Sequence, residues 1–475
     1  MNDPHPILVG GVWEAAGDEL VARAAGTGEV LGRTFHATAE QLDRATSAAV
    51  AAFAVTKRLP SYQRAAILQR IADGILDRKD EIARSLAQEI GKPLGDSLIE
   101  TERTAFLFHY AAGEAERLGG ELLPLDLVAS SAGKWAITRR FPIGPVAGIS
   151  PFNVPLSLSA HKLAPAIAVG NPIVLKPDSR VALTLLKVAE VIVDAGVPEG
   201  SVSVLPMAVD IADAMVSDDR FKLLSFTGSA RVGWGMKARA GRKQVVLELG
   251  GNAAAIVAAD ADLDVVMKRL VQGAFKYAGQ ICISTQRILV HSSLADQLRD
   301  RLVAGAEAQK VGDALDDGVD LGPMISEQAA ERAVALVNEA VAAGAVLLTG
   351  GSHSGAYMKP TLLEGVPADA RLAREEAFAP VAIFEVFDDL VDAINRVNAG
   401  DFGLQAGVFT RDLRAIWAVF EGLDVGGVII NDIPGYRIDH MPYGGVKDSG
   451  LGREGVKYAI EHMTELRTLV ITPES

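Results

Sequence analysis

Between residues 171 and 249, short apolar segments alternate with stretches in which apolar residues recur at helical spacing. The apolar segments lie at 171–176, 201–206, 221–226 and 244–249, and the helical stretches between them lie at 181–195, 210–216 and 228–240. Strands and helices that alternate in this way form a parallel sheet with crossover helices, and such sheets bind ligands at the carboxyl ends of their strands. The pattern therefore predicts an α/β fold with a ligand site at that edge.

A second alternating block extends from residue 252 to about residue 430 and predicts another α/β unit. Its strand-like segments lie at 287–293, 345–351 and 382–387, and its helical segments lie at 294–308 and 327–343. Ahead of both blocks, helical spacing over 61–90 predicts one long amphipathic helix that ends at Gly91. Alternating apolar and polar residues over 119–142 predict a β-hairpin, which we expect to form an arm with the strand-like segment 466–472.

Length, charge and cysteine content exclude several classes of function. The chain has 475 residues, enough for two or three domains, and its 60 acidic and 46 basic side chains give a net charge of −14. An acidic chain without a run of Lys and Arg repels nucleic acid. No leader sequence or uninterrupted membrane-spanning segment is recognisable. Because Cys282 is the one cysteine, no intrachain disulfide or thiolate metal cluster can form, and we expect a cytoplasmic protein.

Three short motifs carry candidate catalytic side chains. Cys282 lies in AGQICIST, Glu248 in ELGGN and Asn153 in SPFNVP. Taken alone, each has a structural interpretation: a cysteine packed between isoleucines, an acid on a strand and an asparagine in a turn. Four further motifs accompany them: VLKPD at 174–178, FTGS at 226–229, EEAFAP at 375–380 and MPYGGVKDSGLGREG at 441–455. Seven such motifs in one chain are not explained by chance.

Together the seven motifs resemble those of the aldehyde dehydrogenase superfamily, from about residue 59 to the C-terminus, with the lactaldehyde, semialdehyde and glyceraldehyde-phosphate branches closest. The resemblance implies a Rossmann-type cofactor domain, an α/β catalytic domain and a β-arm for oligomerisation into a homodimer or homotetramer. The implied boundaries are 1–118 and 142–249 for the dinucleotide-binding domain, 250–440 for the catalytic domain, and 119–141 with 456–475 for the arm.

The implied activity is NAD(P)-dependent oxidation of an aldehyde to a carboxylic acid. A Cys282 thiolate attacks the aldehyde carbon, and the Asn153 amide with the Cys282 backbone N–H stabilises the resulting oxyanion. Hydride transfer to the nicotinamide leaves a thioester, which a water activated by Glu248 hydrolyses. Lys162 and Glu454 match positions that relay protons behind Glu248, although a structural ion pair explains them as well. The resemblance implies no catalytic metal.

The motif FTGS ends a predicted strand and opens a helix, so Gly228 allows close approach while Ser229 and the helix N-terminus meet a pyrophosphate. The resemblance assigns these residues to the dinucleotide: Ser150, Phe152, Lys176, Ser179, Phe226, Gly228, Ser229, Leu249, Glu376 and Phe378. Lys176 is expected at the adenosine ribose, Glu376 at the nicotinamide ribose and Phe378 at the ring. Ser179 stands where NAD-preferring relatives often carry glutamate, so either NAD or NADP fits, and we favour NAD.

The glycines near the C-terminus do not form a second dinucleotide motif. Gly450, Gly452 and Gly455 spell GxGxxG, but no strand precedes them and too little chain follows for a βαβ unit. We interpret them as loop glycines. Ala379 replaces the glycine that is usual in the EEAFAP motif, which leaves the geometry of that loop open.

The resemblance places seven residues around a substrate tunnel above the nucleophile: Arg103, Leu158, His161, Ile281, Ile283, Arg437 and Tyr443. Basic groups at His161 and Arg437 favour a small polar or anionic aldehyde, such as lactaldehyde or a semialdehyde. Alternatively, Arg437 pairs with Asp439 and His161 is a packed core residue. The collar of Ile281 and Ile283 would equally suit a benzaldehyde-like substrate.

Two alternatives of other classes remain open. The chain could be an acyl-transferring enzyme that releases acyl-CoA, but that branch typically lacks the glutamate found here at Glu248. It could also be a catalytically silent structural relative, but Cys282, Glu248 and Asn153 are all retained.

Overall fold

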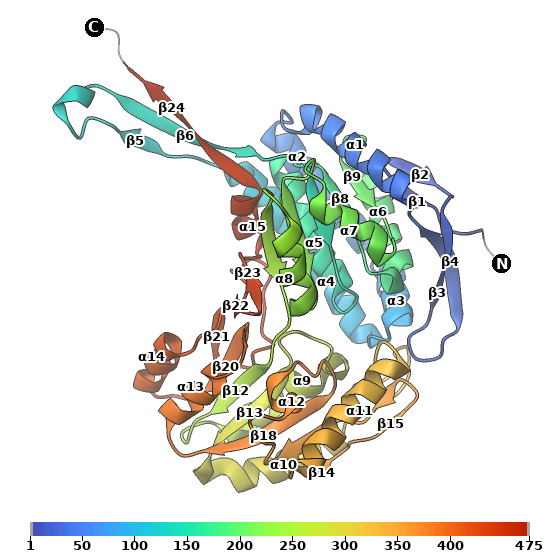
Figure 1. Ribbon diagram of the computed structural model, residues 1–475, viewed down its shortest axis with the longest axis vertical. Helices are drawn as coiled ribbons and strands as arrows, with labels where there is room; N and C mark the ends of the chain where they lie inside the picture. The colour runs from blue at the N-terminus through green and yellow to red at the C-terminus, as the bar shows by residue number, and fades with distance from the viewer. Residues whose placement is uncertain (1–2, 473–475) are drawn as a thin grey trace.

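A computed structural model describes residues 3–472 and shows two facing α/β units with an arm that projects from the upper one (Figure 1). The upper unit is built on an eight-stranded sheet in the order β2-β1-β9-β8-β7-β10-β11-β23. Its strands are β1 (Ile7–Val9), β2 (Val12–Glu14), β7 (Val146–Ile149), β8 (Ile173–Lys176), β9 (Val202–Val204), β10 (Leu223–Thr227), β11 (Gln244–Glu248) and β23 (Gly450–Leu451). The five strands from β9 to β11 are parallel, which confirms the predicted crossover pattern.

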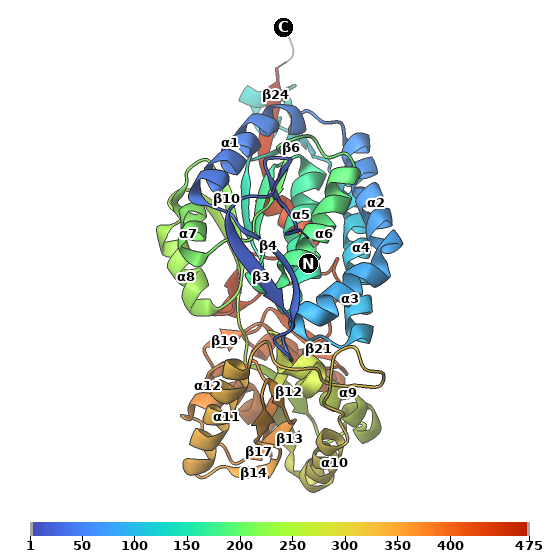
Figure 2. The ribbon, with the colours of Figure 1, turned by 90° about the vertical axis from the view of Figure 1, so that its right-hand side faces the viewer.

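Helices cover both faces of this sheet, with α7 and α8 on one face and α2 to α4 on the other (Figure 2). The helices of this unit are α1 (Ala39–Thr56), α2 (Ser61–Asp77), α3 (Lys79–Ile90), α4 (Leu94–Arg117), α5 (Pro155–Val169), α6 (Ala182–Asp194), α7 (Val209–Ser217), α8 (Ala230–Arg239) and α15 (Val456–His462). Helix α5 is buried along its whole length, since it packs between the sheet and neighbouring helices. It therefore carries polar side chains such as His161 and Lys162 into the interior.

The prediction of one helix over 61–90 is wrong, because the chain breaks between α2 and α3. Arg78 leaves the helical region at φ −106° and ψ 20°. Its guanidinium pairs with Glu81 at 2.9 Å and with Glu190 of α6 at 2.8 Å. The acids Asp80 and Glu81 stand in the first turn of α3, where negative charge favours a helix N-terminus. The predicted end at Gly91 is confirmed by its left-handed φ of 69°.

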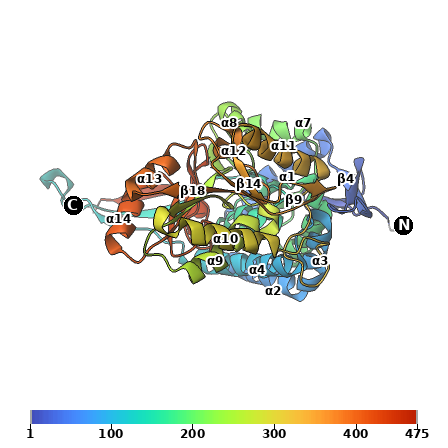
Figure 3. The ribbon, with the colours of Figure 1, turned by 90° about the horizontal axis from the view of Figure 1, so that it is seen from below.

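The lower unit holds a seven-stranded sheet in the order β14-β17-β18-β13-β12-β20-β21, parallel except for β14. Its strands are β12 (Ala253–Val257), β13 (Thr285–His291), β14 (Val346–Thr349), β17 (Thr361–Glu364), β18 (Val381–Phe387), β20 (Gln405–Phe409) and β21 (Gly427–Ile430). Its helices are α9 (Leu263–Phe275), α10 (Ala295–Glu307), α11 (Glu327–Ala342), α12 (Arg371–Arg374), α13 (Leu390–Asn398) and α14 (Leu413–Gly422). Figures 2 and 3 show α9 and α10 on one face and α11 and α12 on the other. The second predicted α/β unit is thus confirmed.

The projecting arm is a three-stranded antiparallel sheet of β5 (Leu122–Pro124), β6 (Trp135–Pro142) and β24 (Thr464–Ile471). The hairpin expected over 119–142 and its pairing with the last strand are therefore present. Residues 456–462 form helix α15, which packs against α4 and α5, so only β24 of this terminal segment lies in the arm. Residues 1–2 and 473–475 of the expected domain ranges lie outside the described residues.

Three small antiparallel pairs complete the structure: β3 (Asp18–Arg23) with β4 (Val30–His36), β15 (His353–Ser354) with β16 (Tyr357–Met358), and β19 (Phe402–Gly403) with β22 (Val446–Lys447). The β3–β4 hairpin and the arm lie at opposite ends of the molecule (Figures 1 and 3). Over residues 3–472, none of the helices combines the length and hydropathy that crossing a bilayer requires.

Candidate active site

Cys282 lies in a turn between a short 3₁₀ segment, Lys276–Gly279, and strand β13. The preceding backbone is left-handed at Tyr277, Ala278 and Gly279, with φ of 50°, 51° and 66°. Only glycine fits at position 279, since a Cβ there would lie 2.0 Å from the Ala379 carbonyl oxygen. Strained backbone of this kind occurs where a functional group must be presented in one orientation.

The sulfur of Cys282 lies on the wall of a cavity of about 160 Å³ between the two units. All seven residues expected at the substrate tunnel line this cavity: Arg103, Leu158, His161, Ile281, Ile283, Arg437 and Tyr443. Asn153 lines it as well. Cys282 is partly exposed, so the interpretation of an inert core cysteine does not hold.

The Cys282 Sγ and the Tyr443 Oη are 3.1 Å apart, within hydrogen-bond distance. The guanidinium carbon of Arg437 lies 3.7 Å from the centre of the Tyr443 ring, in a cation–π contact. Removal from water raises the pKa of the Cys282 thiol to about 12, while the Tyr443 hydroxyl and then Arg437 act in the opposite direction. Sequence reasoning treated Tyr443 as a tunnel residue and gave no sign of its contact with the sulfur.

Asn153 is buried at the start of helix α5 and is held by one hydrogen bond. Its Nδ2 donates to the backbone oxygen of Gln280 at 3.0 Å, and Gln280 in turn accepts a bond from the Ile325 N–H at 2.8 Å. An amide nitrogen carries two N–H groups, so one remains for a ligand. Asn153 lines both the substrate cavity and the larger cleft described below, which places it where the two meet.

Glu248 ends strand β11 and is 3% exposed. Neither of its carboxyl oxygens has a hydrogen-bond partner within residues 3–472, which is unusual for a buried carboxyl group. Burial, followed by the negative charge of Glu454, raises the pKa of Glu248 well above its ordinary value. Gly444 makes room for this side chain, since a Cβ there would lie 2.8 Å from the Glu248 Oε1. A carboxyl group in such a setting is suited to accept a proton near neutral pH.

Lys162 and Glu454 form a buried ion pair, with the Nζ and Oε1 3.1 Å apart. Lys162 also donates to the Thr227 Oγ1 at 2.7 Å. The second oxygen of Glu454 accepts from Arg437 at 3.1 Å. Burial raises the pKa of Glu454, but the positive charges of Lys162 and Arg437 outweigh burial and lower that pKa to about 2, so this carboxylate is charged at neutral pH. The two residues are paired with each other, and the charges of both act on the Glu248 carboxyl group.

The alternative in which Arg437 pairs with Asp439 is wrong, because Arg437 pairs with Glu454 and Asp439 pairs with Arg103 at 2.8 Å. His161 lies between the two pairs: its Nε2 is 2.8 Å from the Arg437 Nη2 and 3.2 Å from the Asp439 Oδ1. The Arg437 guanidinium can only donate and the Asp439 carboxylate can only accept, so the His161 Nε2 bonds to Arg437 when it carries no proton and to Asp439 when it carries one. Burial, with the charge of Arg437, lowers the pKa of His161 in agreement with a neutral ring.

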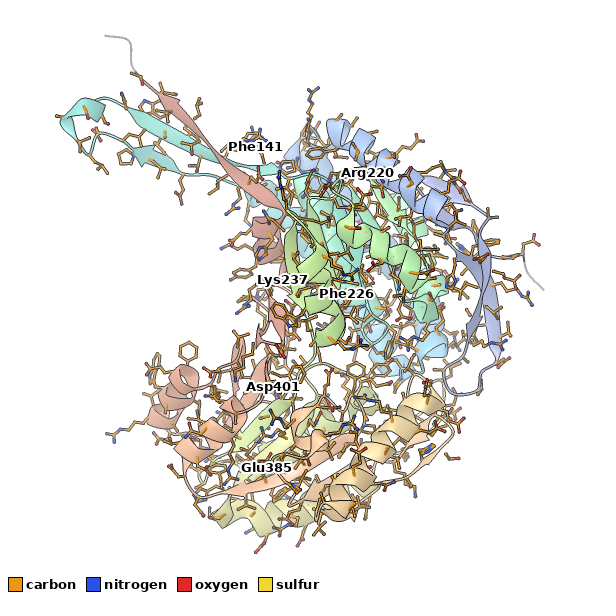
Figure 4. The ribbon with its side chains drawn as sticks, in the orientation of Figure 1. Phe141, Arg220, Phe226, Lys237, Glu385 and Asp401 are labelled. Carbon is orange, nitrogen blue, oxygen red and sulfur yellow. The ribbon has the colours of Figure 1, made fainter. Side chains whose placement is uncertain are left out.

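A larger cleft of about 1170 Å³ separates the two α/β units and opens at the carboxyl ends of β7, β8 and β10. Figure 4 shows two of its lining residues on opposite sides, Phe226 on the upper unit and Asp401 on the lower one. The residues expected at the cofactor that line this cleft are Ser150, Phe152, Lys176, Phe226, Gly228, Ser229, Glu376 and Phe378. Ser179 and Leu249 are not among the lining residues. The Ser179 hydroxyl contacts the His36 Nε2 at 3.0 Å, and Leu249 is buried.

The lining of this cleft fits a dinucleotide. Helix α8 starts after Ser229, whose side chain makes no capping bond to it, so the first backbone N–H groups and the helix dipole face an anion site. Glu376 accepts a bond from the Gly251 N–H at 3.1 Å, and burial raises its pKa to about 7. Phe152 and Phe378 meet edge to face with ring centres 6.0 Å apart. Over residues 3–472, the His, Cys, Asp and Glu side chains form no group of three able to hold a metal ion.

The sequence was compared with known proteins and families, and residues 13–469 match the model of the aldehyde dehydrogenase family. The chain belongs to the aldehyde dehydrogenase family. It is 40% identical over 468 residues to the 3-sulfolactaldehyde dehydrogenase of Priestia megaterium, an alignment that covers 98% of each chain. The expectation of an NAD(P)-dependent aldehyde dehydrogenase with this fold is confirmed.

Two solved structures show how far the likeness extends. Aldehyde dehydrogenase 21 from Physcomitrella patens, in complex with the reaction product succinate, superimposes with a TM-score of 0.97 at 44% identity, covering 99% of this chain and 98% of that one. Glyceraldehyde-3-phosphate dehydrogenase GapN from Methanocaldococcus jannaschii, complexed with NADP, gives a TM-score of 0.93 at 38% identity, covering 97% and 100%. The expected resemblance to semialdehyde and glyceraldehyde-phosphate dehydrogenases is confirmed, since proteins with these names are among the relatives.

Proposed function

We propose that this aldehyde dehydrogenase oxidises a small polar or anionic aldehyde, lactaldehyde- or semialdehyde-like, to its carboxylic acid through a thioester on Cys282. The observation that carries the proposal is the set of cations on the cavity wall beside the sulfur. Four cations, Lys92, Arg103, Lys276 and Arg437, face three carboxylates, those of Asp96, Glu100 and Asp439. Each of these cations is paired with a carboxylate, and Arg437 is paired with Glu454. The side chains of Arg103 and Lys276 remain 37% and 34% exposed, so they can meet an anionic group of a substrate.

The first step is addition of the Cys282 thiolate to the aldehyde carbon. A carbon–sulfur bond forms while the carbonyl π pair moves onto oxygen. The free N–H of the Asn153 amide and the Cys282 backbone N–H stabilise that oxyanion, and the Gln280 carbonyl keeps the amide in place. Loss of one such donor costs roughly 10²–10³ in rate in other enzymes.

A dinucleotide bound in the large cleft would supply the acceptor for the hydride of the carbon attached to Cys282. Ser229 and the N-terminus of α8 would hold its pyrophosphate, Lys176 the adenosine ribose, and Glu376 the nicotinamide ribose. Phe378 would pack against the nicotinamide ring. Ser179 puts no carboxylate at the adenosine 2′ position, so NADP is tolerated, and we favour NAD as the usual partner.

Hydrolysis of the thioester is assigned to Glu248. Its carboxylate takes a proton from water as the water oxygen attacks the acyl carbon, and the carbon–sulfur bond then breaks to return the thiolate. Lys162 and Glu454 would carry that proton onward to solvent, helped by the hydrogen bonds that Lys162 donates to Glu454 and to Thr227. The presence of this base argues against transfer of the acyl group to coenzyme A, and an assay with and without coenzyme A tests that alternative.

The names of the relatives support the substrate class. Sulfolactaldehyde, glyceraldehyde 3-phosphate and the aldehyde that yields succinate each carry an anionic group away from the reacting carbon. Both Arg103 and Arg437 line the cavity beside Cys282. The side chain of Arg103 is 37% exposed, whereas that of Arg437 is 9% exposed. A distal sulfonate, carboxylate or phosphate would approach these guanidinium groups.

An aromatic aldehyde is the second candidate. Leu158, Ile281 and Ile283 line the same cavity and present apolar surface beside the sulfur. A benzaldehyde-like ring would pack there without using Arg103 or Arg437.

The substrate assignment is tested by comparing kcat/KM for succinate semialdehyde, lactaldehyde and benzaldehyde in wild type, Arg437→Gln and Arg103→Gln. Loss of a charge-assisted hydrogen bond lowers kcat/KM by about 10- to 100-fold. We expect that loss for the semialdehyde and a much smaller one for benzaldehyde. An equal change for all three substrates would overturn the anion-binding assignment.

We further propose that residues 1–118 and 142–249 bind the dinucleotide, that residues 250–440 form the catalytic domain, and that 119–141 with strand β24 serve assembly into a dimer or tetramer. Apolar side chains exposed on the arm, including Leu122, Leu466 and Leu469, support the last point. Light scattering of wild type and a Leu466→Asp variant tests it. A cytoplasmic location is also proposed, since a reducing compartment keeps a nucleophilic cysteine as a thiol.

A further inference from the structure

Tyr443 is fixed in place beside the sulfur by its own backbone. Its N–H donates to the Glu454 carbonyl at 3.1 Å, and the Glu454 N–H donates back to the Tyr443 carbonyl at 2.7 Å. The residue is 3% exposed, so its phenol cannot turn to water without unpacking. The packing of Tyr443 therefore fixes the contact between its Oη and the Cys282 Sγ, which are 3.1 Å apart.

Arg437 makes this phenol a better hydrogen-bond donor. Its guanidinium lies over the ring at 3.7 Å and is held there by Glu454 at 3.1 Å and by the His161 Nε2 at 2.8 Å. A cation over an aromatic face draws electron density from the ring and strengthens the O–H as a donor. The same positive charge also favours a negative charge on the nearby sulfur.

We propose that Tyr443 is a catalytic residue, whose hydroxyl donates a hydrogen bond to the ionised form of Cys282 and so increases the fraction of the thiol that is present as the nucleophilic thiolate. The thiol proton leaves to solvent, the sulfur keeps the electron pair of the S–H bond, and that pair accepts the Tyr443 O–H. When the pair forms the bond to the aldehyde carbon, the hydrogen bond is released. The inference rests on Cys282 being the nucleophile, as proposed above.

The charges around the sulfur show why such a donor is needed. Burial opposes ionisation of the thiol, and the carboxylates of Glu376 and Glu248 oppose it further. Only the Tyr443 hydroxyl and Arg437 act the other way. The phenol itself stays protonated, since burial and the neighbouring Cys282 raise the pKa of Tyr443 well above its ordinary value. It can therefore donate but does not compete with the sulfur for the negative charge.

Alkylation of the thiol by iodoacetamide tests the inference in the full-length protein. Because Cys282 is the chain's one cysteine, every alkylated molecule carries the label there. Below the pKa of the thiol, the rate constant is proportional to the thiolate fraction. A hydrogen bond to a charged group shifts that pKa by about 1–2 pH units, so Tyr443→Phe should alkylate about 10- to 100-fold more slowly than wild type at neutral pH.

Tyr277→Phe is the matched control, because Tyr277 lines the same cavity but donates its hydroxyl to the Ile90 carbonyl at 3.2 Å. We expect this variant to alkylate at the wild-type rate. Equal rates for Tyr443→Phe and wild type would overturn the inference, and so would an equal slowing in both variants, which would show a general effect of the cavity. Thermal unfolding of both variants establishes that they are folded.

The same experiment distinguishes failure of the proposed role of Tyr443 from failure of the proposed function. If alkylated wild type retained its dehydrogenase activity, Cys282 would not be the nucleophile and both proposals would fail. If alkylation abolished activity but Tyr443→Phe reacted at the wild-type rate, only the role of Tyr443 would be lost.

Discussion

Replacing Glu248 by glutamine separates the two halves of the proposed reaction. Addition to the aldehyde and formation of the thioester use Cys282 and Asn153, whereas hydrolysis needs a base, and glutamine cannot accept the proton. We therefore expect a burst of about one reduced cofactor per active site, followed by a steady rate about 10²–10⁴-fold below that of wild type, which is the usual contribution of a general base. The amide has nearly the same size as the carboxyl group, so the cavity should keep its shape.

The same substitution also reports on the burial of Glu248. The folded-state pKa of this group is raised by desolvation. Its contribution to stability is therefore fully present below the unfolded-state pKa of about 4.3 and is lost as the pH rises through the folded-state value, by about 1.4 kcal/mol for each pH unit of elevation. Glutamine does not titrate. The free energy of unfolding of Glu248→Gln relative to that of wild type should accordingly increase as the pH rises above about 4.3.

Two measurements decide this prediction. Rapid-mixing absorbance of the reduced nicotinamide gives the burst and the steady rate, and denaturant unfolding at several pH values gives the stability difference. Full steady turnover by Glu248→Gln would mean that another group is the base. A stability difference that does not change with pH would contradict the desolvated carboxyl group seen at the end of β11.

Three further substitutions test other parts of the site. Cys282→Ala should abolish oxidation while leaving dinucleotide binding by equilibrium dialysis unchanged, because the sulfur is not part of the cleft lining; retained oxidation would contradict its role. Lys162→Met should lower the free energy of unfolding by about 3–5 kcal/mol, since Glu454 would lose one partner of a buried ion pair, and a loss below 1 kcal/mol would speak against that pairing. Gly279→Ala should lower the thermal midpoint and the activity, because its Cβ would meet the Ala379 oxygen at 2.0 Å, whereas Gly235→Ala, which meets nothing within 4 Å, should do neither.

The order of strands and helices could largely be predicted from the sequence. The spacing of apolar residues within one segment indicates whether it forms a helix or a strand and which of its faces is buried. The crossover pattern between residues 171 and 249 gave the parallel sheet, and Gly91 marked a helix end. The break at Arg78 was not readable in the same way. Apolar spacing continues across it, and the cause is an ion pair with Glu190 on a helix more than a hundred positions later in the chain.

In the candidate site too, features within one segment could be predicted from the sequence, whereas contacts between distant segments could not. The motifs around Cys282, Glu248 and Asn153 identified the family because each motif is a local run of residues. Pairings between distant segments could not be read: Arg437 contacts Glu454 and not Asp439, and Ser179 meets His36. The contact of Tyr443 with the sulfur joins residues 161 positions apart in sequence and depends on the backbone ladder to Glu454. Such contacts are products of the fold and have no signature within one segment.

In the proposed reaction, the substrate becomes covalently bound to the sulfur atom of Cys282. Mass spectrometry of Glu248→Gln, quenched in acid during turnover with aldehyde and dinucleotide, tests it directly. We expect the peptide containing Cys282 to gain the mass of the acyl group, and we expect no gain when the dinucleotide is omitted. Accumulation of free acid with no adduct on that peptide would contradict it.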